Sequence, residues 1–241
     1  MAVIPVLIFH AFPQLVPGGF YGVDIFFVIS GYLISGIIFR GLDKDSFSFC
    51  DFYIKRIKRI IPNLVAVLIF VAVVGWFITS AGEYKNIGAN ISHSALFYQN
   101  FGLMREEGYF NVLAQNNPLL HIWSLAIEEQ FYLLFPLLCF AIWKIGKHSK
   151  QALGLFVVLL TVSSLMCCFL LENNDVRFYF PLSRFWELGV GICVSYAETF
   201  YEISAKNHDQ KYISLISVFG FSFITLAFFV PTNLYPPPGD L

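Results

Sequence analysis

Several ionisable side chains of this sequence lie inside long apolar stretches, and the first is His10, in Ile8-Phe9-His10-Ala11. An imidazole titrates close to neutral pH, so His10 could act as a general base that takes a proton from a substrate hydroxyl. A lone histidine in an apolar run can equally be a buried residue whose ring bonds to a backbone carbonyl. The local sequence leaves both interpretations open.

A second polar group opens an apolar helix predicted from about 119 to 143. His121, Ser124 and Glu128 recur at i, i+3 and i+7, so they share one helix face, whereas Glu129 points about 100° away. Charged groups inside a membrane segment are expensive, so at least one carboxylate must face another helix, a cavity or a cation. The two carboxylates could take part in chemistry, or they could belong to a packing network between helices.

A third pair, Arg184 and Glu187, stands one helical turn apart, so the two charges can neutralise each other. Gly189 and Gly191 follow directly and permit close approach of another helix. In a functional interpretation, one of the two charged groups faces a substrate. The alternative is a structural ion pair inside the bundle.

Four cations within five residues, Lys55, Arg56, Lys58 and Arg59, precede another apolar segment. Positive residues hold a loop on the cytoplasmic side of a membrane, and this alone can explain them. A phosphorylated cytosolic substrate could use the same charges, because the planar guanidinium forks of Arg56 and Arg59 suit phosphate.

The amino-acid composition indicates the class of protein in which these residues lie. Of 241 residues, 57% are hydrophobic, 18% aromatic and only 13% charged, whereas a soluble domain carries roughly a quarter charged residues. A net charge of -1 and a mean hydropathy of +0.69 argue against a nucleic-acid binder. The five cysteines show neither zinc-ligand spacing nor a disulfide framework, so no metal is predicted. The sequence therefore predicts an all-α, polytopic transmembrane helical bundle.

About seven spans are predicted from the apolar runs. They cover about 1 to 13, 20 to 40, 60 to 80, 119 to 143, 151 to 171, 182 to 198 and 212 to 230. With the N-terminus in the cytoplasm, 11 of the 15 Lys and Arg residues fall on the cytoplasmic side, which favours that orientation. The segment from about 81 to 118 is then an external loop, with a helical stretch predicted to lie along the membrane surface.

The ordered set of motifs resembles a known family. The stretches are Phe9-His10-Ala11, Gly18-Gly19-Phe20-Tyr21-Gly22-Val23-Asp24-Ile25-Phe26-Phe27-Val28-Ile29-Ser30-Gly31-Tyr32-Leu33-Ile34, Arg56-x-x-Arg59-x-x-Pro62, Trp123-Ser124-Leu125-x-x-Glu128-Glu129-Gln130-Phe131-Tyr132 and Arg184-x-x-Glu187-x-x-x-Gly191. In this order they resemble the membrane acyltransferase family 3, the O-acyltransferases that modify bacterial surface polysaccharides. The resemblance covers nearly the whole chain.

The resemblance implies a multi-pass protein of the bacterial inner membrane that moves an acyl group, usually acetyl, from cytoplasmic acyl-CoA to a glycan hydroxyl. The acceptor is a surface glycan such as lipopolysaccharide O-antigen or peptidoglycan, and the implied partners are this glycan and membrane lipid. His10 matches the family's first-helix histidine, with Glu128 expected to orient it or balance its charge. Arg56 and Arg59 match the motif expected to bind the donor phosphates. Supporting positions are Asp24, His121, Ser124, Glu129, Arg184 and Glu187.

The sequence departs from the family pattern at both ends. A basic residue usually precedes the first-helix histidine by eleven positions, which falls before Met1 here. Members usually have about ten spans, and some add an extracytoplasmic SGNH-type domain that receives the acyl group. We therefore expect residues 1–241 to form a single, incomplete transmembrane acyltransferase domain. The competing class is a transporter or assembly partner with buried structural charges, which specific acyl-CoA binding would distinguish.

Overall fold

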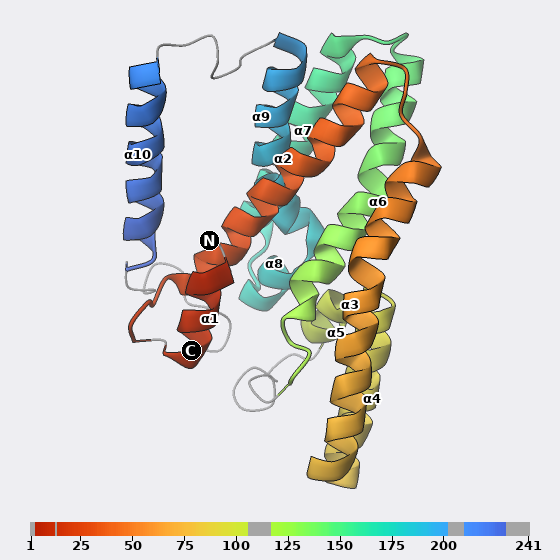
Figure 1. Ribbon diagram of the computed structural model, residues 1–241, viewed down its shortest axis with the longest axis vertical. Coiled ribbons are helices and arrows are strands. Elements are labelled where there is room, and N and C mark those ends of the chain that lie inside the picture. The colour runs from red at the N-terminus through yellow and green to blue at the C-terminus, as the bar shows by residue number, and fades with distance from the viewer. Residues whose placement is uncertain (1–2, 13, 106–116, 202–209, 230–241) are drawn as a thin grey trace.

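The computed structural model describes residues 3–12, 14–105, 117–201 and 210–229, and every regular element within these ranges is helical (Figure 1). The elements are α1 (Val3–Ala11), the 3-10 turn η1 (Gly19–Tyr21), α2 (Gly22–Asp43), α3 (Phe49–Ile78), α4 (Ala81–Ala95), α5 (Gln99–Arg105), α6 (Ile122–Ile145), α7 (Lys150–Leu170), α8 (Asn174–Tyr179), α9 (Pro181–Tyr201) and α10 (Gln210–Ala227). The predicted all-α membrane bundle is confirmed.

The predicted number of seven spans is wrong. Within the described ranges, four helices are long and apolar enough to cross a membrane, namely α2 together with η1, α3, α6 and α7. Helix α1 has only nine residues, about 13.5 Å of rise against a hydrocarbon core of about 30 Å. Helix α9 mixes charged residues into its 21 positions, and the apolar part of α10 covers only Ser217–Ala227. Apolar runs in the sequence therefore overcounted the spans.

Helices α2 and α9 make the most extensive contact of the bundle, and glycines allow it. A Cβ atom at Gly31 would lie 2.1 Å from the Leu188 carbonyl oxygen, and one at Gly191 would lie 2.0 Å from that of Val28. No side chain fits at these distances, so small residues let the two backbones meet, as is common between membrane helices. Helix α7 also packs against α9, which fixes the position of the charged residues on α9.

Adding one methyl group at this contact is expected to destabilise the protein. In Gly191→Ala the new Cβ meets the Val28 carbonyl, so α2 and α9 must separate, at a cost of about 1 to 3 kcal/mol. Thermal unfolding of the detergent-solubilised protein should show a lower midpoint. Gly88→Ala in α4 is the control, since nothing lies within 4 Å of its added Cβ. Equal midpoints for both variants would contradict the close helix contact.

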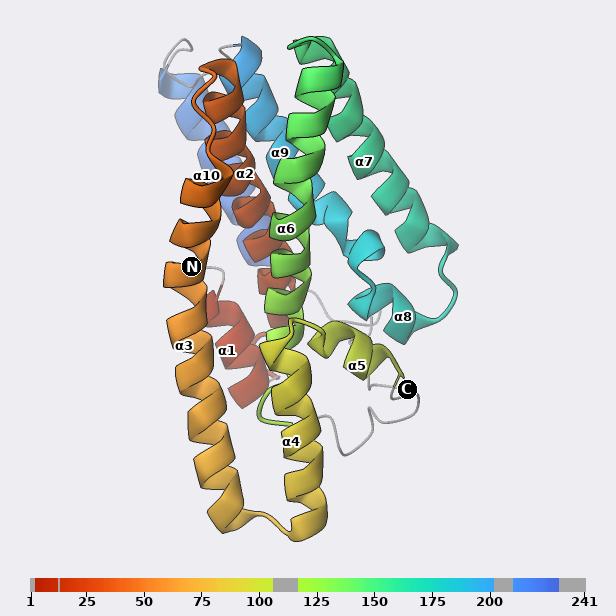
Figure 2. The same cartoon turned by 90° about the vertical axis from the view of Figure 1, so that its right-hand side faces the viewer.

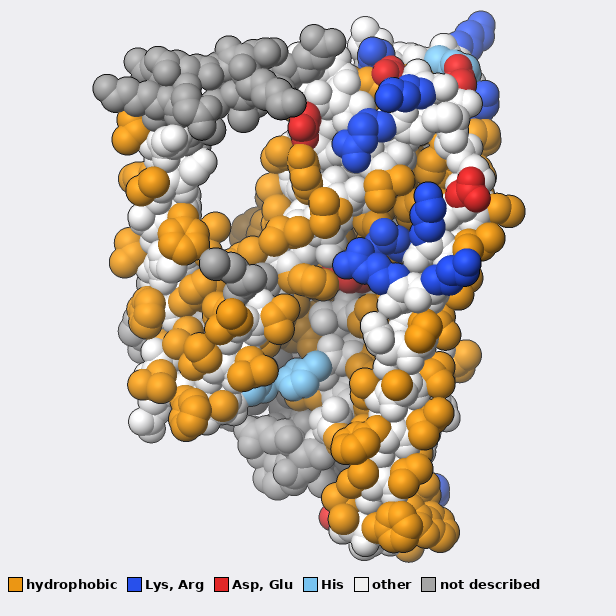
Figure 3. Space-filling model, viewed as in Figure 1, with side chains coloured by type: hydrophobic (Ala, Val, Ile, Leu, Met, Phe, Trp, Pro, Cys, Tyr) orange, Lys and Arg blue, Asp and Glu red, His pale blue; other side chains and the backbone are white. Residues whose placement is uncertain are grey.

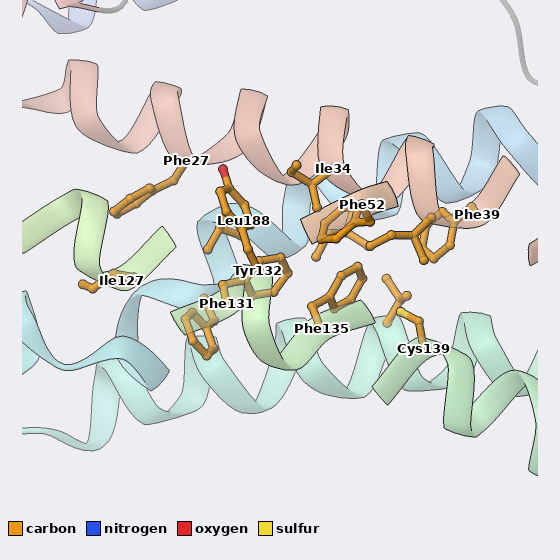
Figure 4. Close-up of a cluster of buried hydrophobic side chains, with 14 of the residues drawn as sticks. Phe27, Ile34, Phe39, Phe52, Ile127, Phe131, Tyr132, Phe135, Cys139 and Leu188 are labelled. Atoms are coloured by element: carbon orange, nitrogen blue, oxygen red, sulfur yellow. The ribbon is translucent and has the colours of Figure 1, made fainter. Parts of the chain in front are cut away.

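The apolar core lies where α2, α6 and α9 face one another (Figure 4). Phe27 and Phe39 of α2 and Leu188 of α9 are fully buried in it, together with Phe135 of α6. The rings of Phe131 and Phe135 stack with their centroids 4.6 Å apart, one turn along α6. Burying several aromatic rings stabilises this contact strongly, so α6 holds a fixed position against α2 and α9.

Helix α3 is longer than a single span, with 30 residues and about 45 Å of rise. Helix α4 follows it directly, because Ser80 and Glu83 form a capping box in which each side chain accepts a hydrogen bond from the other's backbone N–H. The helical stretch expected along the membrane surface instead runs back beside α3 (Figure 2). Residues 106–116 of the predicted external loop lie outside the described residues.

Candidate active site

Two imidazoles from different helices meet at one end of the bundle, here called the histidine end. His10 lies in the last turn of α1, and His121 immediately precedes α6. Their ring centroids are 4.5 Å apart, and the ring planes are perpendicular. The His10 Nδ1 atom lies 2.8 Å from the carbonyl oxygen of Val6. Since a carbonyl only accepts, Nδ1 carries a proton, which leaves Nε2 of the neutral ring free to accept one.

Both histidines belong to the exposed surface of the bundle. Packing around the His121 ring nevertheless lowers its pKa below the usual histidine value, and the nearby His10 lowers it further. The first interpretation of His10, a general base, and the second, a ring bonded to a backbone carbonyl, are therefore compatible. One ring nitrogen is held by Val6 while the other stays available at the surface.

A buried ion-pair cluster lies behind the histidine end. Arg184 Nη1 is 2.8 Å from Glu187 Oε1, which is the pairing that the one-turn spacing predicts, and Nη2 is 2.7 Å from Asp24 Oδ1 on α2. The guanidinium carbon lies within 6 Å of the ring centroids of three aromatic residues, Phe27, Trp123 and Phe178. Only 1% of the Glu187 side chain is exposed, so its charge depends on Arg184.

The two carboxylates of α6 face different neighbours. Glu128 is buried within hydrogen-bonding reach of the hydroxyls of Ser30 on α2 and Tyr132 on α6, although its Oε1 atom has no partner among the described residues. The cation that acts on Glu128 is Arg59, and the cation that acts on Glu129 is Arg56. Both carboxylates therefore face helices or cations rather than lipid, whereas the sequence predicted this of at least one.

The predicted cation cluster lies on α3 at the level of these carboxylates. The Arg56 guanidinium carbon is 6.0 Å from the ring centroid of Tyr132, while Lys55, Lys58 and Arg59 are exposed. Figure 3 shows Lys and Arg side chains over the upper part of α3 and histidine side chains lower on the same face, with a hollow between them. Arginine and imidazole groups thus border one region of the surface from two sides.

The structure does not bring every predicted site residue together. Glu128 was expected to orient His10 or to balance its charge, but it lies seven residues after His121, about 10.5 Å along α6. The ring against His10 belongs to His121 instead, because α1 is short and reaches only the start of α6. Ser124 is turned to its own helix, where its hydroxyl donates to the His121 carbonyl oxygen at 3.1 Å.

Sequence reasoning missed four neighbours of this site. Tyr132 follows Glu128 by four positions, so helical periodicity could have grouped the two residues. Ser30 comes from another helix, and only the fold reveals its approach to Glu128. Likewise, Trp123 of α6 and Phe178 of α8 contact Arg184, and no spacing rule connects these segments.

The chain is similar to several known proteins. A profile of the family described as "Acyltransferase domain" matches residues 1–239. The chain is 37% identical over 199 residues to an "Uncharacterized protein" of Haemophilus influenzae, covering 80% of each chain. It is 31% identical over 216 residues to the "Putative peptidoglycan O-acetyltransferase YrhL" of Bacillus subtilis, covering 87% of this chain and 34% of that protein. It is 30% identical over 237 residues to the "Putative O-acetyltransferase SACOL0978" of Staphylococcus aureus, covering 94% and 38%.

The chain thus spans about a third of the length of the named O-acetyltransferases that it matches, and four fifths of the Haemophilus relative. No solved structure matches the chain. The matched residues include His10 and His121, the arginine pair of α3 and the ion-pair cluster.

Proposed function

Because the chain belongs to the acyltransferase domain family, we propose that it transfers an acetyl group from cytoplasmic acetyl-CoA to a hydroxyl of a bacterial surface glycan. The observation that carries this proposal is the exposed His10 ring, whose Nδ1 is held by Val6 and whose Nε2 is free to accept a proton. A positioned imidazole of this kind is the group that hydroxyl activation needs. The protein acts in the inner membrane, with its N-terminus in the cytoplasm.

In the proposed reaction His10 is the general base. Its Nε2 atom removes the hydroxyl proton as the acceptor oxygen attacks the thioester carbonyl carbon, and the carbon–sulfur bond then breaks. Glu128, which lies apart from His10, serves the donor side of the site together with Tyr132. The ion-pair cluster of Asp24, Arg184 and Glu187 keeps α2 and α9 in place around the reaction.

The donor phosphates are assigned to Arg56 and Arg59. Arg59 is exposed and Arg56 is half-buried, so their guanidinium groups can reach a phosphate from the cytoplasmic side. Tyr132, beside Arg56, lies eleven residues from His121, about 16.5 Å along α6. The long pantetheine arm of acyl-CoA suits this separation, because it carries the thioester far from the phosphates.

The acceptor is proposed from the relatives. The name of the Bacillus protein includes the word peptidoglycan, so that polymer is the first acceptor to test. Lipopolysaccharide O-antigen is the second. The acyl group passes to the glycan directly or through an SGNH-type extracytoplasmic domain on a partner. Radiolabelled acetyl-CoA supplied to membranes, followed by isolation of each glycan, separates these acceptors.

Exchanging both arginines of the donor site for lysine is expected to weaken acetyl-CoA binding roughly tenfold or more. Arg56→Lys with Arg59→Lys keeps both charges but loses the two-pronged hydrogen bonds to phosphate. Binding of labelled acetyl-CoA to purified protein in lipid nanodiscs measures the change. Lys55→Arg with Lys58→Arg is the matched control and should leave the affinity unchanged.

A reporter fused at Lys147 checks that the orientation of the arginine variant is unaltered. If the arginine variant bound acetyl-CoA as tightly as the unsubstituted protein, the cation cluster would serve only to set the orientation in the membrane. Absence of specific binding by the unsubstituted protein would favour a transporter or an assembly partner over an acyltransferase.

A further inference from the structure

The contact between the two histidine rings carries an inference about how the base works. We propose that His10 and His121 form one paired-imidazole base that holds a single proton, in which His10 contacts the substrate and His121 is its positioning residue. The inference rests on the proposed function for its chemistry. The pairing itself rests on the centroid separation of 4.5 Å and the perpendicular ring planes.

His10 needs a partner because its own helix is weakly anchored. None of the nine residues of α1 is buried, and α1 packs mainly against η1 and α2. His121, by contrast, adjoins Trp123, which is 6% exposed and packed into the core, and its carbonyl accepts a hydrogen bond from Ser124. The His121 ring therefore gives His10 a rigid surface at the start of α6, and this contact fixes where Nε2 points.

The perpendicular arrangement favours one proton and disfavours two. In such a pair the edge of one ring faces the π surface of the other, which stabilises an imidazolium beside a neutral imidazole. Two imidazolium rings at the same separation repel each other. The lowered pKa of His121, to which His10 contributes, agrees with this coupling. When His10 takes a proton, His121 stays neutral.

The reaction step balances with one proton passing through the pair. The acceptor hydroxyl gives its proton to His10 Nε2 while its oxygen forms the new bond to the acetyl carbonyl carbon. The carbon–sulfur bond breaks, and the thiolate takes the proton from His10 to leave as the free thiol. His121 binds no proton at any stage, but its neutral ring stabilises the imidazolium of His10.

Helix α1 packs against η1 and α2, and α2 packs against α9. These elements carry the titratable groups Tyr21, Asp24, Arg184 and Glu187. Asp24 and Glu187 both pair with Arg184 in a cluster of their own. Among the described residues, His10 is the charge that acts on His121. A shift in the titration of His121 therefore reports on His10.

The first test needs no turnover. Protein labelled with ¹⁵N-histidine in lipid nanodiscs is titrated by NMR with and without the substitution His10→Phe. Phenylalanine keeps an aromatic ring but carries no charge, so the midpoint of His121 should rise by at least about 0.7 pH unit, the value that a water-like dielectric gives at this separation. His148→Phe is the control, because His148 stacks on Trp143 at the other end of α6.

In the control variant His148→Phe, the titration midpoint of His121 should not change. An unchanged midpoint in His10→Phe would overturn the pairing. The NMR spectrum itself shows whether each variant is folded, and His10→Gln provides a second neutral variant in case phenylalanine disturbs α1.

The second test follows acetyl transfer in His121→Phe across the acidic pH range. If the active form needs both rings neutral, the logarithm of kcat/KM in the unsubstituted protein falls with a slope of about 1 as the pair takes its first proton, and steepens toward about 2 only at lower pH, where the second ring is protonated. In the variant the slope stays at about 1 throughout. A purely structural role would lower the rate without changing the slope, and equal slopes would refute the pairing. Loss of transfer in the unsubstituted protein would count against the proposed function and leave the titration result standing.

Discussion

Replacing His10 by alanine is expected to reduce acetyl transfer by about 10² to 10⁴-fold, the contribution that a positioned general base makes. The ring is exposed, and it bonds to the Val6 carbonyl within the same helix, so its loss should disturb the bundle little. The substitution is made in the chromosomal copy of the gene. Base-labile acetate in the isolated surface glycan is then compared with the parent strain.

The matched control for this substitution is His148→Ala, in the turn between α6 and α7 at the other end of the bundle. It should retain full transfer, and immunoblots of the membrane fraction should show equal amounts of both variants. Full acetylation by His10→Ala would remove His10 from the mechanism. The histidine would then be a residue that only bonds to the backbone of α1.

Replacing Arg184 by methionine is expected to have the largest effect on stability. Glu187 would be left unpaired in a nearly fully buried position, without the guanidinium 2.8 Å away, and removing one partner of such a pair costs about 3 to 5 kcal/mol. Unfolding of the protein by SDS in mixed micelles measures the change. The surface pair of Lys150 and Asp43, at 3.4 Å, offers the control Lys150→Met, for which a loss of about 1 kcal/mol or less is expected.

The double variant Arg184→Met with Glu187→Met separates charge from packing. Because no buried carboxylate is then left unpaired at position 187, it should recover much of the lost stability. Asp24 is less buried than Glu187, since 31% of its side chain is exposed. If the double variant were as unstable as Arg184→Met alone, packing of the arginine against its aromatic neighbours would be the main contribution.

The helical class and the local ion pair could be predicted, because both depend on short-range patterns. A low share of charged residues and long apolar runs specify a membrane bundle, and the one-turn spacing of Arg184 and Glu187 specifies their contact. The number of spans could not be predicted from apolar runs alone. Helix α1 ends after nine residues and α4 runs back beside α3, and both outcomes depend on tertiary packing.

The candidate site was predictable residue by residue but not as an arrangement. The sequence identifies the ionisable residues that lie in apolar surroundings, yet their partners come from distant segments. Asp24 meets Arg184 across 160 positions, and His10 meets His121 across the whole of α2 to α5. A helical period can show that His121 and Glu128 share a side of α6, but it cannot show that α1 reaches only the first of them.

Sealed, inside-out vesicles can show whether this protein transfers acetyl groups from cytoplasmic acetyl-CoA to a surface glycan. The vesicles come from cells that carry the protein and from cells in which its gene is deleted, and [¹⁴C]acetyl-CoA is added outside, where the cytoplasmic face is exposed. We expect base-labile [¹⁴C]acetate on surface glycan in the first vesicles, and only background label in the deletion vesicles and in vesicles that carry His10→Ala. Equal labelling of all three preparations would contradict this expectation.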